Sequence, residues 1–158
     1  MNTWAPPDCD VEKVNVVQPQ RIFVDTGAWF ALQVTDDRYH AIAREVFPKL
    51  LKSYQTLTTT NHVIGETYTL LRTAKGFNAA WRFLETLEQS PRIQRMFVSS
   101  KIEQDAYLLL HRYSEHPFSF VDGISFCIMK KEAISHAFAF DRHFVTAGFM
   151  RVPLDMAL

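Results

Sequence analysis

The sequence contains only two cysteines, and neither belongs to a pattern that forms a disulfide framework or a cysteine-based metal site. Cys9 lies in a polar leader, whereas Cys127 lies in an apolar helical stretch where a small buried thiol is expected. Residues 1–10 lack a basic start followed by an apolar run, so no signal peptide is visible. No apolar stretch approaches the roughly 20 residues that a membrane span needs. These absences argue against a secreted or membrane protein and predict a cytoplasmic one.

An excess of positive charge is missing as well. Seventeen Lys and Arg residues balance 17 Asp and Glu residues in a chain of 158 residues. This balance argues against a protein that coats nucleic acid by charge alone. It does not argue against an enzyme that acts on nucleic acid, because bound divalent cations would add local positive charge. Apolar residues make up 47% of the chain, which is ample for the buried core of one domain.

Short apolar runs alternate with amphipathic segments from Arg21 onward, and this alternation predicts an α/β fold. Parallel strands need crossovers of about a dozen residues, which the helical segments supply. We predict a three-layer α/β/α sandwich with a parallel sheet of four to five strands. Residues 1–20 are expected to form an N-terminal extension, flexible or packed in extended form, and residues 21–158 the domain. Strands are expected at 21–24, 55–59, 96–98, 136–140 and 151–154, and helices from the first strand through Val34 and at 39–54, 61–73, 78–88, 99 or 100–113 and 122–131.

Four acidic residues in four predicted elements are expected at one edge of this sheet. Ligands bind to open parallel sheets outside the carboxyl ends of the strands. Asp25 directly follows the first strand, and Asp141 directly follows the fourth. Asp122 opens a helix after residues 118–121, and Glu66 lies about two turns into the helix that follows the second strand. The four carboxylates can therefore reach a single cleft.

Each of these acids has a simpler interpretation when it is taken alone. An Asp between a strand and a helix is most often an N-cap, and a Glu in a helix is most often a solvated surface residue. Glu66 has weakly charged neighbours, however, and Gly65 costs its helix about 1 kcal/mol relative to Ala, which suggests a close approach there. Coincidence does not readily explain four such acids at one edge, so we interpret them as a site.

A cluster of carboxylates favours a hard divalent cation. Unneutralised carboxylates repel one another, and their pKa values rise until some of them are protonated. Mg²⁺ or Mn²⁺ relieves this repulsion and prefers oxygen ligands, whereas the lack of an ordered set of Cys and His argues against zinc. A metal at such a site can polarise a phosphodiester, lower the pKa of a bound water and stabilise the leaving oxygen.

The same residues resemble the motifs of PIN-domain nucleases, most closely those of VapC-type toxins from toxin–antitoxin pairs. The most specific stretch is Phe-Ala-Phe-Asp-Arg-His-Phe at 138–144. The others are Val-Asp-Thr-Gly-Ala-Trp-Phe-Ala-Leu at 24–32, Gly-Glu-Thr at 65–67 and Phe-Val-Asp at 120–122. The resemblance covers residues 21–154 and departs from the family pattern at Gly123, where Ala or Cys is more usual.

This resemblance implies an endoribonuclease that hydrolyses RNA phosphodiester bonds with a metal-activated water. The implied catalytic acids and ligands of Mg²⁺ or Mn²⁺ are Asp25, Glu66, Asp122 and Asp141, with Glu66 either ligating a metal or orienting the water. Thr26, Arg142 and His143 are candidate helpers, the last two as contacts to substrate phosphate. The resemblance also implies a homodimer and a protein antitoxin bound to the first helices, and no membrane.

Two other functions and one further candidate residue are suggested by the same sequence. A PIN-fold module that binds RNA or protein without nuclease activity would have lost acids, and all four are present. Residues 25–28, Asp-Thr-Gly-Ala, match the tetrad of aspartic proteases, but those enzymes need an all-β scaffold, and residues 29–32 continue into a helix. His62 lies one turn before Glu66 and is a candidate ligand or base, although a partly buried or surface histidine is the simpler interpretation.

Overall fold

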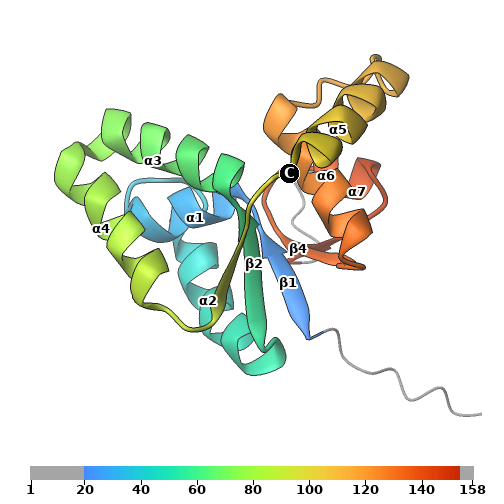
Figure 1. Cartoon of the computed structure of the whole chain (residues 1–158). Helices are drawn as coiled ribbons and strands as arrows, with labels where there is room; N and C mark the ends of the chain where they lie inside the picture. The colour runs from blue at the N-terminus through green and yellow to red at the C-terminus, as the bar shows by residue number, and fades with distance from the viewer. Residues whose placement is uncertain (1–19, 154–158) are drawn as a thin grey trace, which may run out of the picture.

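The computed structural model in Figure 1 describes residues 20–153 and contains one five-stranded parallel sheet. The strand order is β3-β2-β1-β4-β5, so β1 lies at the centre. The predicted fold class is therefore confirmed, while most of the predicted extension and Leu154 lie outside the described residues. The strands are β1 (Arg21–Val24), β2 (Thr56–Thr60), β3 (Ile93–Met96), β4 (His136–Phe138) and β5 (Met150–Val152).

Helices cover both faces of the sheet because the chain crosses over in two directions. From β1 it moves outward to β2 and β3, and it then returns past β1 to β4 and β5. Right-handed crossovers in opposite directions place their helices on opposite faces, and Figure 1 shows α1 to α4 on one side and α5 to α7 on the other. The helices are α1 (Thr26–Gln33), α2 (His40–Ser53), α3 (Asn61–Lys75), α4 (Phe77–Gln89), α5 (Ser100–Arg112), α6 (Phe120–Lys131) and α7 (His143–Thr146).

The central strand is a continuous apolar run because it is covered on both faces. Ile22, Phe23 and Val24 are fully buried. Trp29 of α1 is hydrogen-bonded to the sheet through Thr59. The Trp29 Nε1 donates to Thr59 Oγ1 at 3.3 Å, and Thr59 Oγ1 donates to the Val24 carbonyl at 3.2 Å. These buried hydrogen bonds fix the start of α1 against the ends of β1 and β2. None of the helices among residues 20–153 has the length and apolar character needed to cross a bilayer.

Two expected strands end earlier in the structure than the sequence suggested. The third strand was expected at 96–98, but β3 pairs Ile93 with Leu57 and Met96 with Thr60, the last residue of β2. Phe97 lies beyond this ladder and is 73% exposed. The fourth strand ends at Phe138 and not at residue 140, so a short loop separates it from Asp141.

Two glycines that drew attention in the sequence have different explanations. A Cβ at Gly123 would lie 2.9 Å from Cγ of Leu110, so the close packing of α5 against α6 accounts for glycine in place of a larger residue. A Cβ at Gly65 would meet no atom within 4 Å. The close approach suggested at Gly65 is therefore not made by any described part of the chain.

Candidate active site

A cleft of about 670 Å³ borders the carboxyl ends of β1 and β4. The strand order reverses between these two neighbours, and such a switch point is where parallel sheets bind ligands. The cleft is lined by every acid and helper that the sequence singled out, namely Asp25, Thr26, Glu66, Asp122, Asp141, Arg142 and His143.

Asp25 occupies the N-cap position of α1, but its side chain makes no cap hydrogen bond. It is only 8% exposed. Burial and then the negative charge of Asp122 raise its pKa from 3.8 to about 7, and Glu66 adds to this effect. The backbone N–H groups of Thr26 and Gly27 act in the opposite direction and offset only part of it. A plain N-cap gives no reason for this unfavourable placement, so capping alone does not explain Asp25.

Asp122 is buried in the first turn of α6, and its carboxylate contacts both Ser119 and His143. Its Oδ2 accepts a hydrogen bond from the Ser119 backbone N–H at 2.9 Å, and Ser119 Oγ accepts one from the Asp122 N–H at 3.0 Å. This pair is a capping box. The same Oδ2 lies 2.9 Å from Nδ1 of His143. Asp122 is therefore not the N-cap that its place in the sequence suggested; it is the third helical residue, and its carboxylate both completes the capping box and lines the cleft.

The structural element that carries Asp122 differs from the one expected from the sequence. Residues 118–121 were expected to lead into a helix that Asp122 opens. The helix instead begins at Phe120, with Ser119 as its N-cap, and residues 113–119 directly before it form no strand. Asp122 therefore reaches the edge of the sheet because α6 packs there and not because it follows a strand.

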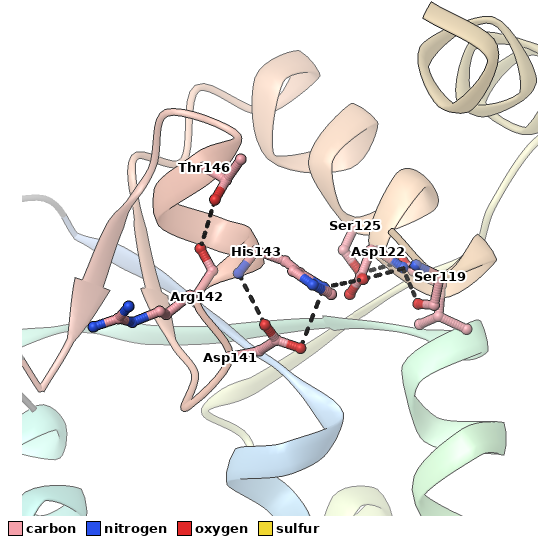
Figure 2. Close-up of polar contacts among 8 residues, drawn as sticks. Ser119, Asp122, Ser125, Asp141, Arg142, His143 and Thr146 are labelled. Atoms are coloured by element: carbon pink, nitrogen blue, oxygen red, sulfur yellow. Dashed lines mark hydrogen bonds and ion pairs between the residues drawn. The ribbon is translucent and has the colours of Figure 1, made fainter. Parts of the chain in front are cut away.

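Asp141 lies in the loop between β4 and α7, where its carboxylate holds the start of the following helix. Its Oδ1 accepts a hydrogen bond from the His143 backbone N–H at 2.9 Å, and its Oδ2 lies 3.3 Å from His143 Nδ1 (Figure 2). The structure places Nδ1 of His143 between the two carboxylates, and its contact to substrate phosphate stays a prediction. Ligand atoms of Asp122, Asp141 and His143 all lie within 4.8 Å of one another, so this trio could hold a metal ion.

The remaining candidates line the cleft in different ways. Glu66 projects from α3 and is half-buried, but it is not part of the close trio. Thr26 Oγ1 is buried and has no hydrogen-bond partner within residues 20–153. The exposed Arg142 extends away from Asp122 and His143 in Figure 2. His62 lies outside this cleft and packs its ring against Phe120 at 5.7 Å, consistent with the simpler interpretation of that histidine.

These residues fit a hard divalent cation. Carboxylate oxygens are the ligands such cations prefer. A cation would offset the mutual repulsion that helps to raise the pKa of Asp25.

Several residues of the cleft were not predicted. Arg38 and Tyr39 come from the loop between α1 and α2, which shows no pattern that predicts its direction. Ser119 could have been found, because Ser119 and Asp122 have the spacing of a capping box. Of the two starts expected for the helix before α6, at residue 99 or 100, the structure has Ser99 as the N-cap of α5, where its hydroxyl accepts from the Ile102 N–H.

A match to a known domain family covers most of the described chain. The PIN domain model matches residues 22–150, and the chain belongs to the PIN-domain family, as the resemblance indicated. The aspartic-protease interpretation is wrong, since the Asp25 loop lies on a parallel α/β sheet.

Relatives in this family are similar to the chain over most of its length. The chain is 37% identical over 131 residues to the 23S rRNA-specific endonuclease VapC20 from two strains of Mycobacterium tuberculosis, covering 83% of this chain and 97% of the relative. It is also similar to the crystal structure of Mycobacterium tuberculosis VapC20, described as a Sarcin-Ricin loop cleaving toxin. That match has a TM-score of 0.76 and 36% identity, and it covers 82% of this chain and 96% of the other.

Proposed function

We propose that the protein is a divalent-metal-dependent endoribonuclease that hydrolyses RNA phosphodiester bonds, and that it is the toxin of a toxin–antitoxin pair acting in the cytoplasm. The observation that carries this proposal is the meeting of Asp25, Glu66, Asp122 and Asp141 in one cleft at the switch point of a PIN fold. The relatives are named for cleavage of 23S rRNA, so the large ribosomal RNA is the first substrate to test.

The side chains in this cleft divide the chemistry between them. Asp25, Asp122 and Asp141 would hold Mg²⁺ or Mn²⁺, and Glu66 would either ligate the metal or orient the attacking water. When bound, the metal lowers the pKa of that water and stabilises the leaving oxygen. The Ser119 N–H and His143 orient Asp122, while the His143 N–H orients Asp141. Thr26 also lines the cleft, and its buried hydroxyl has no hydrogen-bond partner among the described residues.

Removal of divalent metal should abolish RNA cleavage. Without a cation the acids repel both one another and the phosphates of RNA, so we expect an activity loss of about 10²-fold or more after treatment with EDTA. Addition of Mg²⁺ or Mn²⁺ should restore cleavage of 23S rRNA, measured by gel electrophoresis. Cleavage that persists in excess EDTA would contradict the proposal, and metal binding without cleavage of any RNA would favour the non-catalytic PIN module.

We propose further that two copies of the chain associate through an apolar surface on α5 and the start of α6. Tyr107 is 54% exposed and Leu108 is 70% exposed, and Phe120 packs against Tyr107 at a ring distance of 5.8 Å. Exposed apolar patches of this kind commonly mark protein interfaces. A groove of about 500 Å³ beside this surface includes Gly65 and Glu66, so a second copy there would border the catalytic cleft.

Replacement of Leu108 by Glu should convert the dimer into a monomer. A buried unpaired charge in an interface costs several kcal/mol, so sedimentation at micromolar concentration should show a single species of monomer mass. Val145→Glu is the matched control, because Val145 is also exposed but lies on α7. A Leu108→Glu protein that keeps the mass of the wild type, or a wild type that is itself monomeric, would contradict this interface.

Binding of an antitoxin to the first helices stays a prediction, and α4 offers a second surface for it. On α1, Trp29 is only 3% exposed, and Phe30 lines the catalytic cleft, so this helix offers little free apolar surface. Phe77 and Trp81 of α4, in contrast, stack at 5.9 Å and are both exposed. We therefore propose that a small protein antitoxin contacts α4 as well as the first helices. A toxin pair requires an adjoining reading frame for a small protein, and its absence would indicate a PIN nuclease outside any pair.

A further inference from the structure

One wall of the catalytic cleft is a stack of three side chains that the proposed chemistry does not use. The rings of Tyr39 and Phe140 lie parallel, with centroids 4.4 Å apart and an interplanar angle of 2°. The guanidinium carbon of Arg38 lies 4.5 Å from the centroid of the Tyr39 ring. All three residues line the cleft that contains the four acids. We call Arg38, Tyr39 and Phe140 the Arg38 stack.

The loop that carries this stack is held in place from both ends. Asp37 Oδ1 accepts a hydrogen bond from the Tyr39 N–H at 2.8 Å, and the Asp37 N–H donates to the Val34 carbonyl at 3.0 Å. One residue further on, Nδ1 of His40 lies 2.7 Å from the Ala31 carbonyl oxygen. These contacts, together with the Tyr39 ring beneath it, hold the Arg38 guanidinium near the cleft before any ligand binds. An arginine side chain positioned in this way loses less conformational entropy when it binds a ligand than a freely moving side chain does.

The other side of the Arg38 stack is also fixed, by a buried arginine of the edge strand. Arg151 of β5 is buried, and its guanidinium donates to the Phe140 carbonyl at 2.9 Å. Phe140 directly precedes Asp141, so the same contact supports both the stack and a predicted metal ligand. The stack is therefore part of the rigid frame of the cleft and not a free loop tip.

The charge of the cleft explains why such an arginine would be needed. Among the described residues, five acids line it, but only two arginines do, Arg38 and Arg142. A polyanionic RNA strand is repelled by carboxylates, and a metal ion neutralises them only at the reaction centre. No carboxylate of residues 20–153 lies within ion-pair distance of Arg38, so its charge is available to a ligand.

We propose that Arg38 binds a phosphate of the substrate RNA next to the cleavage site, with Tyr39 and Phe140 as its platform; this rests on the proposed ribonuclease function. The guanidinium carbon of Arg38 lies over the Tyr39 ring, and no carboxylate of the described residues pairs with this guanidinium, so its N–H groups remain for a ligand. Those groups form a planar fork that matches two phosphate oxygens. A phosphate held by Arg38 would place the RNA backbone along the wall of the cleft, with the neighbouring phosphodiester over the acids.

Replacement of Arg38 by Ala should weaken RNA binding about tenfold. Binding is measured by fluorescence anisotropy with a labelled 23S rRNA hairpin, in an Asp25→Asn background that leaves the RNA intact. The slope of log affinity against log salt should become shallower by about one, because one phosphate contact is lost. In the otherwise unchanged enzyme, KM should rise about tenfold while kcat stays within about threefold. Arg38→Lys should keep the salt slope but recover only part of the affinity, because it loses the fork.

Arg44→Ala is the matched control, since Arg44 is an exposed arginine of the adjacent helix α2 outside the cleft. If Arg38→Ala binds RNA as tightly as Arg44→Ala, the assignment of Arg38 is wrong. Weaker binding with an unchanged salt slope would also overturn it, because that pattern indicates base stacking and not a phosphate contact. In both cases the unsubstituted enzyme still cleaves RNA. A wild type that neither binds nor cleaves RNA would instead refute the proposed function, and this inference with it.

Discussion

Replacement of Asp25 by Asn should abolish RNA cleavage while making the metal-free protein more stable. Asn has nearly the same shape but carries no charge, so it cannot neutralise a divalent cation. We expect a loss of cleavage of about 10²–10³-fold or more. The fold should be retained, because the Asp25 side chain makes no cap hydrogen bond to α1 that Asn would lose.

The gain in stability should depend on pH in a defined direction. Burial and the charge of Asp122 raise the pKa of Asp25 to about 7 in the folded protein, against 3.8 as its ordinary value. A raised pKa means that the folded state binds the proton more tightly than the unfolded state. Stability from the protonated form is therefore complete below pH 3.8 and is lost as the pH rises toward 7. Above that pH the charged carboxylate costs the metal-free fold on the order of 4 kcal/mol, which Asn avoids.

Urea unfolding of both proteins in EDTA, at pH 5 and at pH 8, measures this effect. The free energy of unfolding of Asp25→Asn should exceed that of the wild type by more at pH 8 than at pH 5. Circular dichroism before unfolding checks that both proteins have the same secondary structure. Equal stability differences at the two pH values would show that Asp25 is not a desolvated carboxylate. Cleavage by Asp25→Asn at the wild-type rate would remove Asp25 from the site.

Replacement of Asp122 by Asn should separate the two tasks of this residue. The amide oxygen of Asn can still accept the Ser119 N–H, so the free energy of unfolding should change by no more than about 1 kcal/mol. The lost charge should lower cleavage by about 10²-fold or more. Ser119→Ala makes the opposite change, since it removes the cap hydroxyl that accepts from the Asp122 N–H but leaves the carboxylate.

Ser119→Ala should therefore lower the free energy of unfolding by about 1 kcal/mol and keep cleavage within about threefold of the wild type. Thermal unfolding and 23S rRNA cleavage at saturating Mn²⁺ are measured on both variants. If Asp122→Asn keeps full activity, Asp122 is only a helix cap. If Ser119→Ala loses as much activity as Asp122→Asn, the effect of either change is structural and not due to the carboxylate charge.

The fold class could be predicted because it depends on patterns that repeat along the chain. Alternating helices and apolar strands require a parallel sheet, and the structure has one. Strand order and strand ends could not be predicted in the same way. The end of β3 at Met96 is set by where β2 ends at Thr60, and this pairing joins residues far apart in the sequence.

The site could be predicted in proportion to how directly each residue is tied to a strand. Asp25 follows the central strand, so its place at the edge was visible in the sequence. The placement of Asp122 depends on the packing of α6, and that of Arg38 depends on a loop whose path is fixed by local hydrogen bonds. His143 was identified as a helper, but its position between two carboxylates could not be known without the fold.

The most direct test of the metal site is a crystal grown with Mn²⁺, with diffraction data collected at the manganese absorption edge. We predict an anomalous peak in the cleft, with carboxylate oxygens of Asp25, Asp122 and Asp141 as ligands at about 2.2 Å. The peak should disappear or weaken strongly in Asp25→Asn crystals grown under the same conditions. Full-occupancy Mn²⁺ bound elsewhere, or an empty cleft at millimolar Mn²⁺, would contradict the assignment of these carboxylates to a divalent-metal site.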